Sequence, residues 1–264
     1  MKQFSTLVAL LVAHPLNAQE TYWDMASNGA QSNAGSIYTI TTAGVFTKKY
    51  DFKMNEGISQ RSELLKATNG KYYGVTLGGG NSGLGTLFSY DPGTGVYTVL
   101  VNFTSTLGSQ PERGLVQYSG NGLLYGVCRG GGTNSIGTLF EFNTTTNVIT
   151  KRHNFVSTTG STPRGRLYEF VGRLWGVTQA GGTGSAGIIY DFDPATNITT
   201  RRHSMTTANG SAPATGVIQG FGGLLYGTTQ TGGTNNLGTI YSFNTGTFAY
   251  TRLYSFALGN NGNT

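Results

Sequence analysis

The sequence predicts an all-β protein, an incomplete β-propeller of four-stranded antiparallel blades, of which about five are visible. Glycines recur at positions 35, 85, 137, 187 and 238, at intervals of 50, 52, 50 and 51 residues. Each interval holds short runs of strand-forming residues between turn residues, without helical periodicity over ten residues. Four strands in about 40–50 residues is typical of a propeller blade. A β-solenoid is the alternative, but its rungs are usually shorter.

The repeated phrase begins with an aromatic residue followed by glycine and ends with glycine before a strand. The clear copies span residues 73–88, 125–140, 175–190 and 226–241, and a less regular copy spans residues 23–38. Glycine makes up 42 of 264 residues, against a usual share of about 7%. Because these glycines recur at fixed places, they indicate the turns of a repeated fold.

One unit, residues 114–155, shows the expected strand order. Strands are expected over 114–118, 123–128, 137–142 and 148–155. Tight turns join the first strand to the second and the third to the fourth, because their Gly and Asn residues tolerate positive φ. The Gly-rich loop between the second and third strands, and the long loop to the next unit, should therefore lie on one face of the propeller. The tight turns should lie on the other.

The chain is expected to contain two parts. Residues 1–18 resemble a secretory signal peptide, with Lys2, a short apolar stretch and a plausible cleavage site before Gln19; a buried first strand is the alternative. The apolar stretch is too short to cross a membrane, which needs about 20 residues. Residues 19–264 hold one partial unit, without its first strand, and four full units of about 51 residues. Since the last unit stops mid-phrase, we expect a truncated chain end, with further blades or an anchoring segment missing.

The last full copy carries a family resemblance. It contains Leu225-Tyr-Gly-Thr-Thr229, then Gly232-Gly233, and then Gly238-Thr-Ile-Tyr241. This phrase resembles the GloVer tandem repeat of bacterial exported proteins, L-Y-G-T-T-x-x-G-G-x-x-x-x-G-T-[VIL]-[FY]. The similarity covers roughly residues 60–256, and 22–60 more weakly. The resemblance implies kelch-like propeller repeats in a secreted or cell-surface bacterial protein, and it implies no activity.

The net charge is +6, and several basic residues share one place in the repeat, the predicted fourth strand. These residues are Lys48, Lys49, Lys151, Arg152, Arg201, Arg202 and Arg252. Lys and Arg on a rim strand discourage edge-to-edge pairing, so we expect a structural role, with a polyanion-binding rim as the alternative. Without a basic groove interleaved with aromatic residues, we expect no nucleic-acid partner.

The usual catalytic and metal-binding patterns are weak. Cys128 is the single cysteine and occupies the place of a threonine in other copies, so we expect a small, unreactive strand residue. His153 and His203 fall at equivalent rim positions on separate units, where convergent metal ligands or a catalytic base are not expected. The Gly runs at 78–80 and 130–132 lack the Gly-Lys-Ser/Thr ending and helix of a phosphate loop. We expect no cofactor and no metal.

Function is expected where the copies differ, on the face that carries the Gly-rich loops. The sequence predicts a non-enzymatic module that binds a glycan or an extracellular protein, either as a monomer or as part of a longer chain. The candidate ligand-binding residues are Asn81, Arg129, Asn134, Gln179, Gln230, Asn235 and Asn236.

Two other function classes stay open. A carbohydrate-active enzyme would need two carboxylates at one pocket, for which Asp24, Glu56 and Glu112 are the candidates. A structural spacer of a larger surface protein would need no ligand at all.

Overall fold

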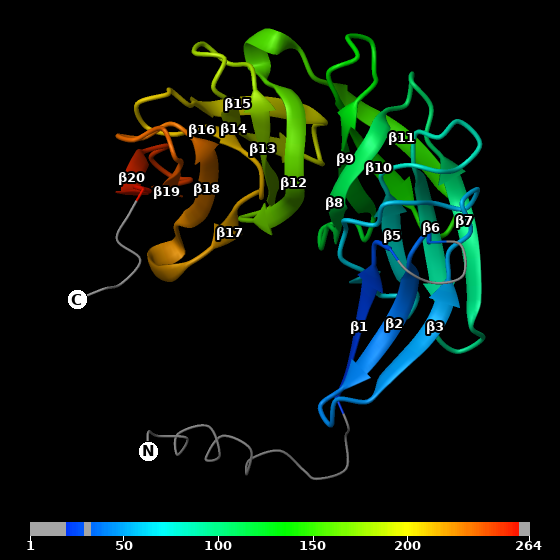
Figure 1. Cartoon of the computed structure of the whole chain (residues 1–264). Helices are drawn as coiled ribbons and strands as arrows, with labels where there is room; N and C mark the ends of the chain where they lie inside the picture. Colours follow the sequence, from blue (N-terminus) through cyan, green and yellow to red (C-terminus); the bar gives the residue numbers. More distant parts are fainter. Residues whose placement is uncertain (1–19, 29–32, 259–264) are drawn as a thin grey trace, which may run out of the picture.

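The computed structural model describes residues 20–28 and 33–258. Over these residues the chain forms five antiparallel sheets, the blades, which follow one another along an open arc (Figure 1). The predicted β-propeller architecture is confirmed, and the predicted signal peptide lies outside the described residues. Within the described ranges, no helix combines the length and the apolar character that crossing a bilayer requires.

Blades 1 to 3 have consecutive strands paired in sequence order. Blade 1 has three strands: β1 (Thr21–Ala26), β2 (Ser36–Thr41) and β3 (Phe46–Asp51). Blade 2 has β4 (Leu65–Lys66), β5 (Tyr72–Thr76), β6 (Thr86–Asp91) and β7 (Val96–Asn102). Blade 3 has β8 (Ser109–Gln117), β9 (Leu124–Gly130), β10 (Thr138–Asn143) and β11 (Val148–Asn154).

Blades 4 and 5 repeat the pattern, each with one short 3-10 helix. Blade 4 has β12 (Ser161–Phe170), β13 (Arg173–Ala180), β14 (Ile188–Asp193) and β15 (Ile198–Ser204). Blade 5 has β16 (Ser211–Pro213), β17 (Ile218–Gln219), β18 (Leu225–Thr231), β19 (Thr239–Phe243) and β20 (Tyr250–Ser255), with β16 and β17 both paired to β18. The helices are Ser157–Thr159, before β12, and Phe221–Gly223, before β18.

The four strands predicted for residues 114–155 are present in blade 3. The largest difference is at the first strand, which begins at Ser109 rather than at residue 114. A register shift between Glu112 and Val116 divides β8 into two paired stretches. Among the described residues, blade 1 has three strands, which correspond to the second, third and fourth strands of the other blades.

A cross-strand contact between glycine and an aromatic ring explains the repeated phrase. Gly126 on β9 lies opposite Phe140 on β10, and a Cβ atom at Gly126 would lie 2.5 Å from the Phe140 ring. The same arrangement pairs Gly74 with Phe88, Gly176 with Tyr190 and Gly227 with Tyr241. The glycine therefore leaves room for the ring to lie across the sheet, where it is buried.

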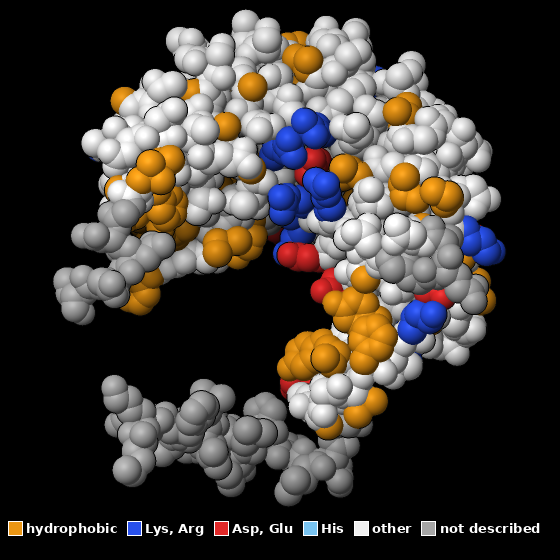
Figure 2. Space-filling model, in the orientation of Figure 1, with side chains coloured by type: hydrophobic (Ala, Val, Ile, Leu, Met, Phe, Trp, Pro, Cys, Tyr) orange, Lys and Arg blue, Asp and Glu red, His pale blue; other side chains and the backbone are white. Residues whose placement is uncertain are grey.

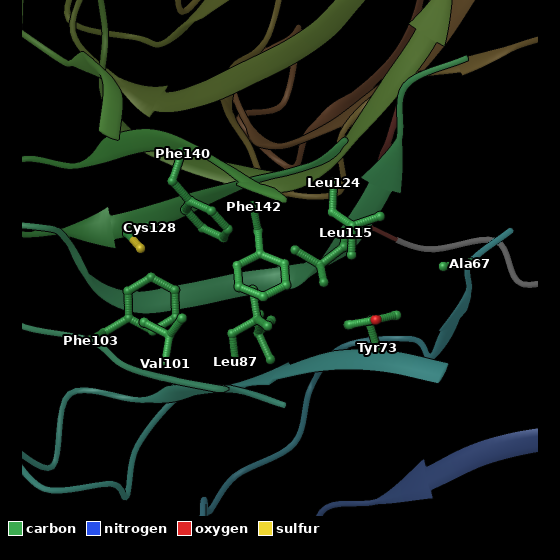
Figure 3. Packing of buried hydrophobic residues seen from close by; sticks show 11 residues of the cluster. Ala67, Tyr73, Leu87, Val101, Phe103, Leu115, Leu124, Cys128, Phe140 and Phe142 are labelled. Atoms are coloured by element: carbon green, nitrogen blue, oxygen red, sulfur yellow. The ribbon is translucent and has the colours of Figure 1, made fainter. Parts of the chain in front are cut away.

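The hydrophobic core lies between successive blades. Leu87, Val101 and Phe103 of blade 2 pack against Phe140 and Phe142 of blade 3 (Figure 3), and both Phe103 and Phe140 are fully buried. Similar clusters join blades 1 and 2, 3 and 4, and 4 and 5. Blades 2, 3 and 4 thus bury two faces, one against each neighbour, whereas blades 1 and 5 each bury one.

The basic residues predicted on the fourth strands do lie there, and three of them join that strand to a loop. Lys151 Nζ donates to the carbonyl of Thr106 at 2.8 Å, and Arg201 Nη1 donates to the carbonyl of Thr158 at 2.8 Å. Arg252 Nη1 makes the corresponding bond to Ala208 in blade 5, at 2.6 Å. This repeated bond supports the structural role over the polyanion-binding rim.

Replacing Cys128 by threonine should stabilise the protein. Its equivalents Thr76 and Thr229 each donate from the hydroxyl to a strand-end carbonyl and meet a second threonine hydroxyl at 2.9 Å. Cys128 is fully buried opposite Thr138. We expect Cys128→Thr to raise the free energy of unfolding by about 1 kcal/mol, through the regained hydrogen bonds.

Chemical denaturation of Cys128→Thr beside Cys128→Val measures this effect. Valine has nearly the shape of threonine but no hydroxyl, so only threonine should stabilise the protein. A gain of equal size in the two variants would show that packing, not hydrogen bonding, explains it.

Candidate binding site on the loop face

The two kinds of long loop meet on one face, as predicted. In blade 3 the amide of Gly132, in the Gly-rich loop, donates to the carbonyl of Ser105, in the loop that enters the blade, at 2.8 Å. The amides of Gly182 and Gly233 make the equivalent bonds in blades 4 and 5. We call this side of the molecule the loop face.

Four of the seven predicted site residues help to build the loops. Asn134 Nδ2 donates to the carbonyl of Phe155 at 3.1 Å, and Asn235 Nδ2 donates to that of Phe256 at 3.2 Å. Asn236 has a φ of 57° and accepts a hydrogen bond from the Gly232 amide. The backbone N–H of Asn81 donates a hydrogen bond to Asn102 Oδ1. All four are exposed, so their role in ligand binding stays a prediction.

The other three predicted residues belong to one row across the blades. Arg129, Gln179 and Gln230 occupy the same repeat position, on the second strands at the base of the Gly-rich loops. Gln179 Nε2 donates to Gln230 Oε1 at 3.3 Å, so blades 4 and 5 are linked there. Arg164 Nε donates to Gln179 Oε1 at 3.0 Å. Arg164, on the first strand of blade 4, was not among the site residues predicted from the sequence.

A buried ion pair lies beside this row. Arg164 Nη1 lies 3.0 Å from Glu112 Oε1, and the side chains are 15% and 3% exposed. Arg113 Nε approaches the other carboxylate oxygen of Glu112 at 3.9 Å. Glu112 is therefore held between two guanidinium groups, one from its own blade and one from blade 4.

More positive charge gathers here than Glu112 can balance. Burial lowers the pKa of the Arg164 guanidinium, and repulsion by Arg129, Arg113 and Arg61 lowers it further, whereas Glu112 raises it. Within the described ranges, neither Arg61 nor Arg129 forms an ion pair. We call Arg61, Arg113, Arg129 and Arg164, with Glu112, the arginine cluster.

The arginine cluster lies near the middle of the arc. Its members come from the first strands of blades 3 and 4, the start of blade 2 and the end of β9. Figure 2 shows Lys and Arg side chains gathered there, between β8 and β12, with acidic side chains at the concave edge. Beside the cluster, Arg166 Nη1 pairs with Glu63 Oε2 at 3.0 Å and joins blade 4 to blade 2.

A signal for this cluster was present in the repeat. Arg61, Glu112, Arg164 and Ala214 occupy one repeat position, next to the proline that recurs at 111, 163 and 213. The charge at this position varies from positive to negative to neutral among the copies, which is a wider range than at any of the loop positions predicted to bind a ligand. Of these four residues only Glu112 was predicted to be functional, as a candidate carboxylate, because function was expected in the variable loops rather than at the start of the first strand.

The acidic residues considered for catalysis have separate partners. Tyr38 donates to Asp24 at 3.4 Å, Tyr50 donates to Glu56 at 2.6 Å, and Glu112 pairs with Arg164. The structure does not bring these three into contact with one common group.

The two histidines occupy the predicted rim positions. His153 and His203 are half-buried beside aromatic rings, and burial lowers the pKa of both. The residues that the structure describes contain no group of three or more His, Cys, Asp or Glu side chains that could hold a metal.

A family model describes the whole repeat region. The Gloeobacter/Verrucomicrobia repeat matches residues 11–179 and 169–264. The chain belongs to this repeat family. No curated protein sequence matches this member of the family.

Solved structures support the propeller fold of this family member. TolB from Acinetobacter baumannii aligns with a TM-score of 0.54 and 14% identity, over 90% of this chain and 53% of that one. A chain of the nidogen/laminin complex aligns with a TM-score of 0.52 and 14% identity, over 85% and 73%. Both neighbours are β-propellers. This chain spans about half the length of the TolB chain, and at such identities the likeness extends to the fold alone.

Proposed function

We propose that this β-propeller repeat protein is an exported, non-enzymatic binding module that holds an acidic glycan at the arginine cluster. The observation that carries the proposal is the repulsion of the Arg164 guanidinium by Arg61, Arg113 and Arg129, while Arg164 itself pairs with the buried Glu112 carboxylate. Guanidinium groups bind carboxylate and sulfate groups through paired, charge-assisted hydrogen bonds. An acidic ligand would reduce the repulsion among these arginines.

The amide row favours a sugar as the carrier of that acidic group. Gln179 and Gln230 lie next to the cluster, and Gln230 is exposed. An amide offers both a donor and an acceptor, as sugar hydroxyl groups require. A glycan with carboxylate or sulfate groups would thus meet cations and amides on neighbouring blades.

Binding is favoured over catalysis because carboxylates are not paired at the cluster. A glycosidase needs one carboxyl group as acid and a second as base or nucleophile. Glu112 is held by Arg164 and Arg113, while Asp24 and Glu56 bond to tyrosines elsewhere.

The test compares matched neutral, carboxylated and sulfated glycans for binding to the purified protein. We expect Arg129→Leu to weaken binding of the acidic members roughly tenfold or more, since a hydrogen bond to a charged group contributes about 1.5–3 kcal/mol. Leucine is a suitable replacement because Leu77 occupies this position in blade 2.

Lys66→Leu provides the matched control. Lys66 is exposed at the end of β4 that pairs with Tyr72, at the opposite end of blade 2 from its Gly-rich loop. The variant removes the same charge, so its affinity should stay unchanged. Equal binding of neutral and acidic glycans would contradict the proposal, and a folded protein that binds no glycan would favour the structural spacer.

A further inference from the structure

Blade 5 exposes a face that every other blade buries against its neighbour. Tyr125, Val127 and Leu139 of blade 3 are buried in the cluster that joins it to blade 4, with exposures of 0–2%. Their counterparts in blade 4, Trp175, Val177 and Ile189, are buried against blade 5 in the same way. In blade 5 the counterparts are Tyr226, Thr228 and Ile240, which are only half-buried.

Two further observations define this open face of blade 5. Tyr226, Thr228 and Ile240 line a surface hollow of about 250 Å³ together with Ile218, which is 64% exposed. Phe256 is 39% exposed, whereas its counterparts Phe155 and Met205 are fully buried. The open face of blade 5 therefore carries the residue types that form interblade contacts in blades 3 and 4, but no blade in the described part of the chain packs against it.

Blade 1 exposes the complementary face, the one with which the other blades contact the preceding blade. In blade 4 this face contains Leu174, Tyr190 and Phe192, which pack against blade 3 and are 0–1% exposed. The residues at these positions in blade 1 are Tyr22, Tyr38 and Ile40, of which Tyr22 is 55% and Ile40 40% exposed.

Phe46, 58% exposed, stacks on Tyr38 with ring centroids 5.0 Å apart, and so extends the apolar surface. Together these four residues form the open face of blade 1.

The two open faces lie at opposite ends of the arc (Figure 1), and Figure 2 shows hydrophobic side chains gathered at both ends. Exposed apolar surfaces of this kind usually mark interaction sites. The chain itself shows what covers such faces, because four interblade contacts join the same two kinds of face.

We propose that the open face of blade 5 binds the open face of blade 1 of a second copy of this chain. The contact repeats, between molecules, the packing that joins successive blades within one molecule. Because the two faces differ, the association is head to tail. A linear assembly of any length then has one open blade 5 face at one end and one open blade 1 face at the other. Such an assembly depends on concentration and differs from the monomer expected from the sequence.

Sedimentation velocity of the purified chain over a range of concentrations tests the proposal. We expect the mass of the unmodified chain to rise with concentration. Ile240→Lys on blade 5 and Ile40→Lys on blade 1 should each be monomeric, because each variant places a charge in one half of the contact. Circular dichroism of both variants should show the unmodified fold, since neither side chain is fully buried.

The decisive sample is an equal mixture of these two variants. The Ile40→Lys protein keeps its blade 5 face and the Ile240→Lys protein keeps its blade 1 face, so the mixture should form 1:1 dimers and nothing larger. Val148→Lys, at a 55% exposed position on the outer strand of blade 3, is the matched control and should assemble like the unmodified chain. The proposal is overturned if the unmodified chain stays monomeric at all soluble concentrations, if either variant still assembles alone, or if the mixture stays monomeric.

Discussion

Replacing Gly187 by alanine is expected to cost roughly 3–5 kcal/mol of unfolding free energy, because a positive φ and a steric clash act together. The residue has a φ of +100°, and a Cβ atom there would lie 2.4 Å from the carbonyl oxygen of Thr178. It would also lie 2.8 Å from Cδ of Pro213, in the next blade. A carbonyl group within a sheet and a proline ring cannot rotate away, so the backbone of both blades would have to move.

Gly122→Ala separates the two causes. Gly122 has a φ of +72°, but a Cβ atom at that position would meet nothing within 4 Å. This variant should therefore cost only about 1–2 kcal/mol, the cost of a left-handed conformation. Urea unfolding of both variants gives the comparison, and equal costs would show that the recurring glycine is needed for its φ alone.

The effect of Gly187→Ala should extend to the binding site. Gly187 closes the Gly-rich loop of blade 4 by a bond from its amide to the carbonyl of Gly181 at 3.1 Å. The added Cβ would also lie 3.2 Å from the backbone carbonyl oxygen of Gln179, the residue whose side-chain Oε1 accepts a hydrogen bond from Arg164. We therefore expect the variant to weaken acidic-glycan binding as well as stability.

The second large effect is expected at Arg164. Arg164→Ala should lower the free energy of unfolding by about 3 kcal/mol, because it removes the main partner of a buried carboxylate. Glu112 is 3% exposed, and its remaining cation, Arg113, lies 3.9 Å away. The carboxylate would then lose its close hydrogen-bonded partner and keep only this longer contact within the interface of blades 3 and 4.

A double-mutant cycle tests this explanation. Ala214 occupies the equivalent position in blade 5, so alanine is compatible with the local fold. The double variant Glu112→Ala with Arg164→Ala should regain most of the lost stability, with a coupling energy of about 2 kcal/mol. Additive losses in the cycle would contradict the role assigned to the ion pair.

The same variants distinguish binding from stability. Glu112→Ala leaves all four arginines of the arginine cluster in place and removes their carboxylate. Its affinity for an acidic glycan should therefore rise, while that of Arg164→Ala should fall.

The blade architecture was predictable because its causes are local. The period, the turn residues and the alternating strands lie within about 50 residues of chain. The pairing of Gly126 with Phe140 is a contact between adjacent strands of one blade, and so it repeats wherever the phrase repeats. The basic residues of the fourth strands, such as Arg201, were also placed correctly, because strand order follows from the order of turns.

The arginine cluster could not be predicted in the same way. Glu112 and Arg164 are 52 residues apart and lie on different blades, as do Gln179 and Gln230. Their contacts depend on how far one blade is rotated and shifted relative to the next, which interblade packing determines and no single repeat encodes. The open faces at the two ends have the same origin. Tyr226 and Ile40 belong to strands that the repeat predicts, but their exposure depends on which blades lie beside them.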